Sequence, residues 1–242
     1  MFDLKGKRAL VTGSTQGIGY AIARAFAEAG AEVYVHCSND LQKAQRIAKE
    51  IGAYGALIAD LSERGAADAL FAATGALDIL VTNASVQYRR PWNEIGDEEF
   101  GMQVQVNLKS TLDLMQKYAE PMKEKGWGRI LTVGSVQQMR PHKDMAVYAA
   151  TKCAVMSLVR NVGKQLAPYG VTVNNLSPGV IATPRNDAAL SDPEYCARVL
   201  AGIPAGYAGE AADCAGAALL LCSDAGRYIV GTDLVVDGGM QL

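Results

Sequence analysis

Short hydrophobic runs alternate along the chain with longer segments whose hydrophobic positions recur at helical spacing. The runs predict β-strands at residues 8–12, 32–37, 55–59, 78–82, 129–133, 172–176 and 234–236. Several are hydrophobic without alternation, as in strands that helices cover on both faces. Helices are predicted between them, at residues 17–28, 41–51, 65–72, 97–125, 147–167 and 210–223. This alternation predicts one α/β domain over residues 1–242, a parallel sheet with right-handed crossovers and helices on both faces.

The segment from Pro178 to Gly209 interrupts this alternation and is rich in Pro, Gly, Ala and Asp. Long excursions of this kind from a compact domain often carry function. We therefore expect a substrate lid at about residues 184–208.

Composition and charge restrict the class of protein. Of the 242 residues, 50% are hydrophobic and 20% are charged, as in an ordinary globular domain. The net charge of −2 argues against nucleic acid or an anionic membrane as a partner, because both select a basic face. No apolar run suits a membrane span, and we expect no signal peptide. The five cysteines form no C-x-x-C pair, which predicts reduced thiols in a cytoplasmic protein, without a metal site or disulfide framework.

A glycine-rich turn joins the first predicted strand to the first predicted helix. It reads Thr12-Gly13-Ser14-Thr15-Gln16-Gly17-Ile18-Gly19. Glycines let a backbone turn tightly and approach a pyrophosphate, and a helix N-terminus offers unpaired N–H groups and a positive dipole end. A turn without a ligand could use the same glycines, but the position between first strand and first helix favours a dinucleotide site.

Tyr148 and Lys152 are four residues apart in a predicted helix, so they share one face of it. A lysine ammonium near a phenol favours phenolate and lowers the phenol pKa from about 10, which makes it a usable proton donor or acceptor. The alternative is a surface Tyr and Lys that only pack together. Chance predicts about half a Y-x-x-x-K in a chain of this composition, so the pair depends on its context.

Two further polar residues stand at informative positions. Ser135 follows the strand at residues 129–133, where its hydroxyl could bind a substrate carbonyl or alcohol, or cap the loop locally. Asn107 lies inside the predicted helix at residues 97–125, where Asn usually faces solvent. A functional Asn would instead hold a water or a carbonyl there.

Together these segments resemble the short-chain dehydrogenase/reductase family over essentially the whole chain. The turn has that family's T-G-x-x-x-G-x-G spacing, and four residues match its Asn-Ser-Tyr-Lys tetrad in order and spacing: Asn107, Ser135, Tyr148 and Lys152. Residues 77–85 resemble its L-D-I-L-V-N-N-A-G, with Thr82 and Ser85 replacing Asn and Gly. Residues 175–183 resemble its N-x-x-x-P-G-x-x-x-T, and residues 236–239 its C-terminal strand and turn.

The resemblance implies a single-domain Rossmann fold, with a seven-stranded parallel sheet in the order 3-2-1-4-5-6-7 and a dinucleotide across the carboxyl ends of the strands. It implies hydride transfer between nicotinamide and a carbinol or carbonyl carbon. Tyr148 would move the proton, Lys152 would lower its pKa and hold the nicotinamide ribose, Ser135 would orient the reacting oxygen, and Asn107 would organise a relay water. Beyond the glycine-rich turn, the implied cofactor contacts are Cys37, Ser38, Asn39, Asp60, Leu61, Asn83, Ala84, Ser85, Tyr148, Lys152, Pro178, Gly179, Ile181 and Thr183.

The choice of cofactor depends on the end of the second strand. NAD-dependent relatives have an acidic residue there, which binds the ribose and repels a 2′-phosphate. Cys37 occupies that position, and Ser38 and Asn39 could donate to a phosphate. Gln16 stands where NADP-preferring members often have Arg, and Asp40 is expected to start the next helix. We expect NADP(H), with NAD(H) tolerated.

The substrate prediction rests on two loops. Arg89 and Arg90 resemble the Arg-Arg pair of gluconate 5-dehydrogenases and related sugar-acid dehydrogenases. Gln137 and His142 lie on the loop after Ser135. Such donors and cations favour a sugar, sugar acid or polyol, whereas an acyl chain needs an apolar groove. Solvated loop or interface roles are the alternative for the two arginines.

Two other functions stay open at this point. One is a 3-oxoacyl-carrier-protein reductase, because many similar proteins have that activity. The other is a non-catalytic dinucleotide-binding regulator, which would have no need of an activated tyrosine. The resemblance also implies a homotetramer or a homodimer.

Overall fold

Seven parallel strands form one sheet in the order β3-β2-β1-β4-β5-β6-β9. The computed structural model describes the backbone of residues 1–242 and the side chains of residues 1–187 and 190–242. The strands are β1 (Arg8–Val11), β2 (Glu32–Cys37), β3 (Gly55–Ile58), β4 (Ile79–Thr82), β5 (Gly128–Val133), β6 (Val171–Pro178) and β9 (Asp233–Val236). The predicted strand order is confirmed, and each predicted strand is found within two residues of its observed ends.

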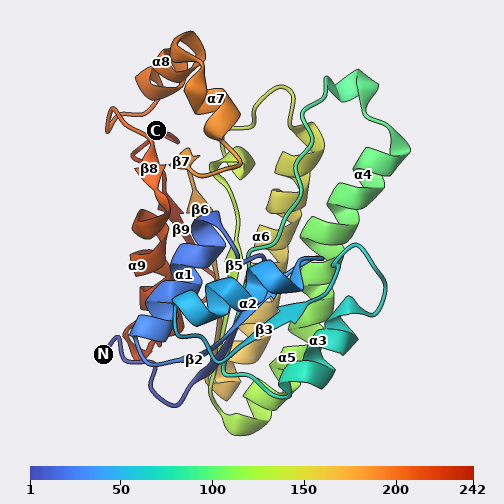
Figure 1. Cartoon of the computed structure of the whole chain (residues 1–242), viewed down its shortest axis with the longest axis vertical. Helices are drawn as coiled ribbons and strands as arrows, with labels where there is room; N and C mark the ends of the chain where they lie inside the picture. The colour runs from blue at the N-terminus through green and yellow to red at the C-terminus, as the bar shows by residue number, and fades with distance from the viewer.

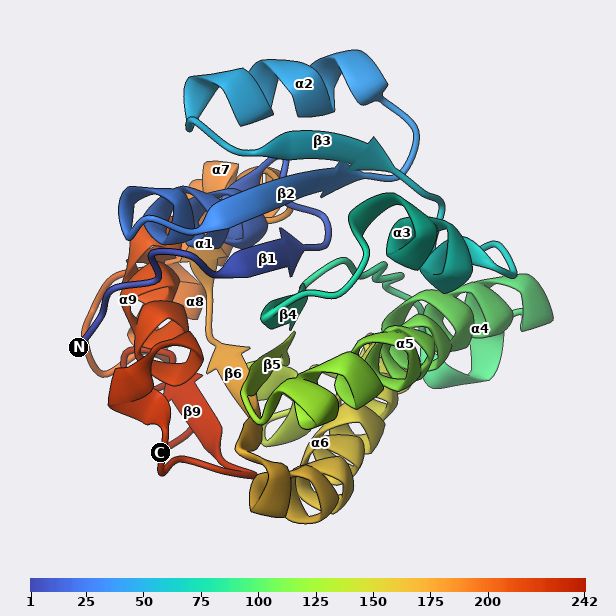
Figure 2. The same cartoon turned by 90° about the horizontal axis from the view of Figure 1, so that it is seen from below.

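Helices cover both faces of the sheet, as the uninterrupted hydrophobic strands predicted (Figure 1, Figure 2). Side chains that alternate along one strand enter different cores: Ala9 and Val11 join one cluster and Leu10 joins another. On the first face lie α1 (Gly17–Glu28), α2 (Leu41–Glu50) and α9 (Ala211–Cys222). On the second lie α3 (Ala66–Thr74), α5 (Ser110–Lys125) and α6 (Ala146–Leu166).

The predicted helix at residues 97–125 is a continuous helical run with an altered middle. It consists of α4 (Asp97–Gln103), a π-helical segment (Val104–Lys109) and α5. Single-turn π segments occur frequently at functional sites. Asn107 lies within this one and is buried, so the expectation that a mid-helix Asn faces solvent does not hold here.

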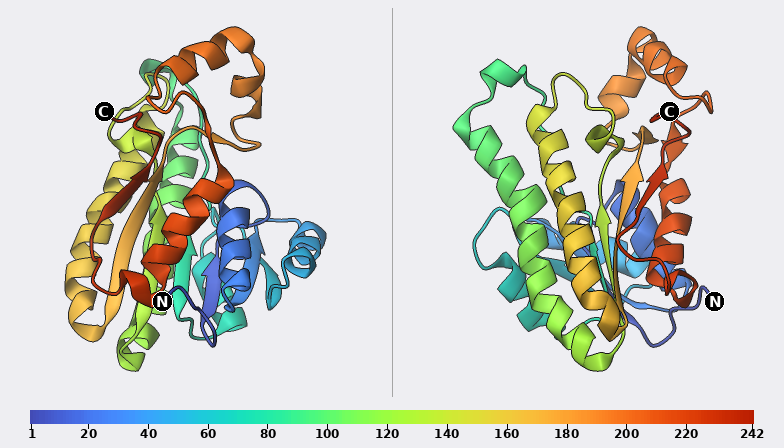
Figure 3. Two further views of the ribbon diagram at one scale, coloured as in Figure 1. Left: turned by 90° about the vertical axis from the view of Figure 1, so that its left-hand side faces the viewer. Right: turned by 180° about the vertical axis from the view of Figure 1, so that it is seen from behind.

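The segment that interrupted the sequence pattern contains short elements that the pattern did not predict. These are β7 (Ile181–Ala182), α7 (Asp187–Ser191), α8 (Pro193–Ala201) and β8 (Gly209–Glu210), with β7 and β8 paired in parallel. α8 begins with a proline, and the side chain of Asp192 caps it, a usual start for a helix. Figure 3 shows α7 and α8 standing at one end of the molecule, near the C-terminus. Whether they act as a lid stays a prediction.

Candidate active site

A cavity of about 810 Å³ lies at the carboxyl ends of the strands. Its wall runs from the ends of β2 and β3, past the glycine-rich turn, to α6 and α8. All but three of the residues predicted to bind cofactor or substrate or to act in catalysis line it. The three that do not are Ser14, Arg90 and Asn107. The structure thus brings together residues that are far apart in the sequence.

The glycine-rich turn has the backbone that its sequence predicted. Gly13 and Gly17 have φ values of 63° and 58°, a left-handed region that favours glycine. A Cβ added to Gly19 would lie 2.5 Å from the carbonyl oxygen of Gly13, so only glycine fits there. Asn83 fixes the turn, because its amide nitrogen donates to the carbonyl oxygens of Thr12 at 2.9 Å and Gly13 at 3.0 Å.

The turn fits a dinucleotide pyrophosphate. Gln16 stands in extended conformation at the N-cap of α1, and its side chain does not cap the helix. The N–H groups of the first turn of α1 therefore remain available at the cavity wall, where the helix dipole favours an anion. No acidic residue stands in that first turn, so nothing in it would repel a phosphate.

A lysine that the sequence analysis did not select stands beside this turn. Lys43 lines the cavity, and its ammonium donates to the side-chain oxygen of Gln16 at 2.8 Å. Asp40 is the N-cap of α2, as expected, and its carboxylate accepts from the backbone N–H of Lys43 at 2.8 Å. The ammonium of Lys43 and the carboxylate of Asp40, which caps α2, thus line the cavity together with Ser38 and Asn39.

His36 lies beneath the same turn and was also missed. Its Nδ1 accepts from the backbone N–H of Gly13, and its Nε2 donates to the carbonyl oxygen of Ala59, both at 3.0 Å. Burial lowers the pKa of His36 to about 4, so the imidazole is neutral at neutral pH. Ser14 lies nearby but outside the cavity lining, and its hydroxyl accepts from the backbone N–H of His36 at 3.0 Å. The sequence signal for this residue was a histidine inside a hydrophobic strand.

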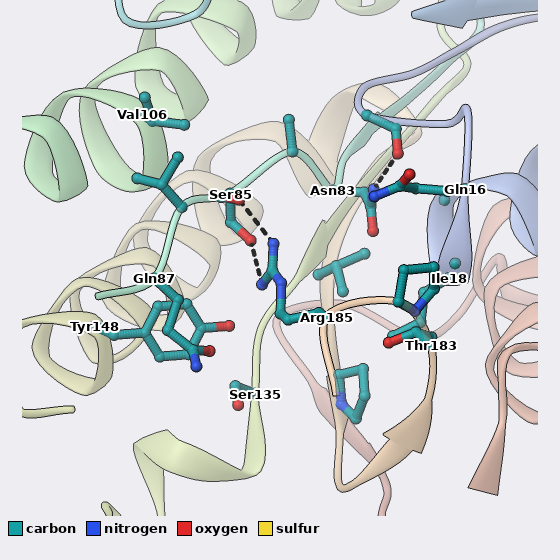
Figure 4. A pocket seen from close by; sticks show the side chains of 18 of the residues that line it. Gln16, Ile18, Asn83, Ser85, Gln87, Val106, Ser135, Tyr148, Thr183 and Arg185 are labelled. Atoms are coloured by element: carbon teal, nitrogen blue, oxygen red, sulfur yellow. Dashed lines mark hydrogen bonds between the residues drawn. The ribbon is translucent and has the colours of Figure 1, made fainter. Parts of the chain in front are cut away.

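Tyr148, Lys152 and Ser135 meet at the far end of the cavity. Tyr148 and Lys152 are 5% and 4% exposed, which excludes the alternative of a surface pair. The ammonium nitrogen of Lys152 lies 5.5 Å from the centre of the Tyr148 ring and donates to the carbonyl oxygen of Val133 at 2.7 Å. Figure 4 shows Tyr148 and Ser135 on the wall of one pocket.

Burial changes the acidity of the Lys152 ammonium. Its burial, and secondarily the positive charge of Arg185, lower its pKa to about 7. Lysine usually titrates near 10.4, so this ammonium releases its proton far more readily than that of an exposed lysine. Perturbed pKa values of this kind cluster at functional sites.

Asn107 is placed as a brace between two segments. Its Oδ1 accepts from the backbone N–H of Val86 at 2.9 Å. Its Nδ2 donates to the carbonyl oxygen of Val86 at 2.9 Å and to the hydroxyl of Thr151 at 3.2 Å. The side chain thus ties the segment after β4 to α6, outside the cavity lining. Its role with a relay water stays a prediction.

The two arginines of the substrate prediction have different surroundings. Arg89 lines the cavity, and its guanidinium donates to the hydroxyl of Tyr195 in α8 at 3.4 Å. Arg90 does not line it and pairs with Glu99 of α4 at 2.9 Å. Gln137 and His142 both line the cavity, and the Gln137 side chain accepts from the His142 backbone N–H at 2.6 Å.

Two features are absent from the part of the chain that the structure describes. No group of three or more His, Cys, Asp or Glu side chains is arranged to hold a metal ion there. None of the described helices has the length and apolar character needed to cross a membrane.

Residues 13–241 match the family model described as enoyl-(acyl carrier protein) reductase. The 3beta-hydroxysteroid dehydrogenase 1 of Eggerthella lenta is 36% identical over 99% of this chain and 95% of its own length. The 3-oxoacyl-[acyl-carrier-protein] reductase FabG of Escherichia coli is 36% identical over 99% of both chains. A gluconate 5-dehydrogenase of Burkholderia cenocepacia, crystallised with NADP and tartrate, superposes with a TM-score of 0.92 at 36% identity, covering 99% of this chain and 96% of its own.

These similarities extend over nearly the full length and agree with the residues of the turn and the tetrad. The chain belongs to the short-chain dehydrogenase/reductase family.

Proposed function

We propose that this chain interconverts a secondary alcohol and a ketone on a sugar, sugar acid or polyol, with NADP(H) preferred to NAD(H). The observation that supports it most is the polarity of the cavity that Tyr148 and Lys152 line. Its lining also includes Arg89, Arg185, Gln87, Gln137 and His142. Many convergent donors suit a polyhydroxylated substrate, because each buried hydroxyl needs a hydrogen-bond partner.

The chain's own residues would have the following roles in the reaction. Tyr148 would exchange a proton with the reacting oxygen, and the hydroxyl of Ser135 would hold that oxygen by a hydrogen bond. Because the pKa of Lys152 is about 7, its amine can take up or release a proton beside Tyr148 at neutral pH. The nicotinamide cofactor, when bound, accepts or supplies the hydride. Gly13, Gly17 and the N-terminus of α1 would hold its pyrophosphate.

The preference for NADP(H) rests on the end of β2. Cys37 stands where an acid would repel a 2′-phosphate, and the ammonium of Lys43 lies beside Gln16 at the same part of the cavity. A gluconate 5-dehydrogenase of similar structure was crystallised with NADP, which supports the choice. The test is kcat/KM with each cofactor, and a preference of about tenfold or more for NAD(H), about 1.4 kcal/mol, would contradict it.

A gluconate 5-dehydrogenase holding tartrate, a hydroxy acid, is among the solved structures that superpose on this chain. This supports a sugar-acid substrate without assigning one. The decisive measurement is turnover of a panel of sugars, aldonates, alditols and acyl thioesters with both cofactors. Turnover of acetoacetyl thioesters with none of any sugar, aldonate or alditol would contradict the proposal.

Reduction of a 3-oxoacyl thioester is the second candidate. A group of apolar residues also lines the cavity, comprising Met102, Val106, Met145, Val199 and Met240. An acyl chain needs such a surface, and the E. coli relative is a 3-oxoacyl-carrier-protein reductase. We rank it second because the cavity lining also has the guanidinium groups of Arg89 and Arg185 and the amides of Gln87 and Gln137, which an acyl chain does not require. A non-catalytic regulator is ranked last, since it would not require Tyr148, Ser135 and Lys152 in one cavity.

The proposal includes a homodimer or homotetramer in the cytoplasm. Exposed aromatic side chains support self-association: Trp92 is 76% exposed and Tyr228 is 98% exposed. The five cysteines are free thiols, as in reducing compartments. Light scattering coupled to size-exclusion chromatography tests the assembly, and a monomer at micromolar concentration would contradict it.

A further inference from the structure

Arg185 reaches from the segment between β7 and α7 to Ser85, and both residues line the cavity. Its guanidinium donates from one terminal nitrogen to the Ser85 hydroxyl at 3.0 Å and from the other to the Ser85 carbonyl oxygen at 2.7 Å. Figure 4 shows its side chain pointing into the pocket that Tyr148 and Ser135 line. No sequence motif had indicated a role for this residue. Arg185 lies in the range expected for a lid, and its position in the cavity depends on the tertiary fold.

The charge of Arg185 acts on Lys152, one of the candidate catalytic residues. Its positive charge is one of the two causes that lower the pKa of Lys152. Arg89 adds a further cation to the lining of the same cavity. Like charges near one another are unfavourable until an anion neutralises them.

No carboxylate among the side chains that the structure describes neutralises these two arginines. Among the described side chains, no carboxylate forms an ion pair with Arg185 or Arg89. The acidic residues that line the cavity are Asp40 and Asp60, which follow β2 and β3. Two guanidinium groups without a carboxylate partner among the described side chains thus line the cavity, and they suit a negatively charged occupant.

The guanidinium of Arg185 keeps donors for such an occupant. Of the five N–H donors of an arginine, two are used by Ser85. The contacts to Ser85 hold the planar group in place, so that less side-chain freedom is lost when a ligand binds. A carboxylate matches the remaining N–H groups better than a hydroxyl, because charge-assisted hydrogen bonds are about twice as strong as neutral ones.

We propose that Arg185 binds the carboxylate of the substrate, so that the enzyme selects hydroxy acids over neutral polyols of the same length. This inference rests on the proposed function and narrows its substrate class. Ser85 acts as the positioning residue, because it holds the guanidinium across the cavity. Arg89 supplies a further positive charge. Its contact with Tyr195 places it against α8.

The test compares matched acids and alcohols, namely aldonates of four to six carbons and the alditols of equal length, with NADP⁺ as cofactor. Variants are Arg185→Gln and Arg185→Lys, with Arg24→Gln as the control, because Arg24 pairs with Glu28 on α1 outside the cavity lining. In Arg185→Gln, we expect the ratio of kcat/KM for aldonate to kcat/KM for alditol to fall on the order of 100-fold, mostly through KM. Arg185→Lys should recover part of this ratio, and Arg24→Gln should leave it within about twofold.

Titration calorimetry of the NADP⁺-bound enzyme with the aldonate gives a readout that does not depend on turnover. The aldonate dissociation constant should weaken in Arg185→Gln by a factor similar to that in KM. Equal losses for acid and alditol would indicate a merely structural role, and a loss in NADP⁺ affinity alone would indicate a cofactor contact. Either result, or an unchanged ratio, overturns the inference.

The substrates that the wild-type enzyme converts distinguish a failure of this inference from a failure of the proposed function. If it converts aldonates or alditols but Arg185→Gln keeps the wild-type ratio, the proposed function stands and the carboxylate role falls. If the wild type converts only 3-oxoacyl thioesters, both fall.

Discussion

The imidazole of His36 is hydrogen-bonded to the backbone N–H of Gly13, the first glycine of the glycine-rich turn, at 3.0 Å. Its other nitrogen binds the carbonyl oxygen of Ala59 at 3.0 Å. The side chain thus ties the end of β1 to the end of β3 from its place in β2. Protonation would put a hydrogen on Nδ1, which could then no longer accept from Gly13.

The free energy of unfolding should therefore depend on pH through His36. Because burial lowers its pKa from 6.5 to about 4, the unfolded chain takes up this proton first as the pH falls. The folded state then loses up to about 1.4 kcal/mol per pH unit between those two values, on the order of 3 kcal/mol in all, and no more below the folded pKa. Urea unfolding across this range should show this slope in the wild type and its loss in His36→Asn, whose amide oxygen can still accept from Gly13. Equal slopes in both proteins would contradict the assignment.

Tyr148→Phe should abolish turnover while leaving NADP⁺ binding largely intact. The change removes only the hydroxyl, and the ring can keep its packed position, where Tyr148 is 5% exposed. We expect a loss in kcat of about 10² to 10⁴, as for removal of a general acid–base group. Fluorescence titration with NADPH provides the binding control. Turnover at the wild-type rate would contradict the mechanism.

The elements that the sequence predicted are those with strong local patterns. Strands buried on both faces appear as hydrophobic runs, and the glycine-rich turn needs glycine for steric reasons that hold at Gly13 and Gly19 themselves. The brace at Asn107 was not predictable, because it depends on a π-helical segment and on the backbone of Val86. Arg185 was missed for a related reason, since its partner Ser85 lies 100 residues away in the chain.

The protonation of Lys152 should appear in the pH dependence of activity. Its pKa is about 7, and Arg185 is one cause of the lowering. The pH profile of kcat/KM for NADP⁺, which reports the cofactor-free enzyme, should inflect near that pH. In Arg185→Gln the inflection should move to higher pH, because removal of a neighbouring cation favours the ammonium. An inflection that stays in place or moves down would show that the two groups are not coupled.

Lys43→Ala should weaken NADPH more than NADH. The Lys43 ammonium stands beside Gln16 at the end of the cavity where a 2′-phosphate is expected, and loss of an exposed charge contact to an anion costs about 1 kcal/mol, or roughly fivefold in affinity. Dissociation constants for both reduced cofactors give the measurement. Lys49→Ala, on the same helix α2 but outside the cavity lining, is the matched control. Equal weakening of both cofactors by Lys43→Ala would contradict a phosphate contact.

Arg89 and Arg90 are neighbours in sequence but should respond differently to substitution. Arg89 lines the cavity and contacts Tyr195 of α8, so Arg89→Gln should raise KM for an acidic substrate by about tenfold, as expected for one partly solvated charge contact.

Arg90 pairs with Glu99, and its side chain is 54% exposed. Arg90→Gln should therefore change KM little and lower the free energy of unfolding by less than about 1 kcal/mol, the usual range for an exposed ion pair. Steady-state kinetics with an aldonate, together with urea unfolding of each variant, measures both effects. If Arg90→Gln raised KM as much as Arg89→Gln, the two arginines would act on the substrate together, and the division seen in the structure would be wrong. If neither variant raised KM for the acid, Arg89 would be a solvated loop residue with no part in binding.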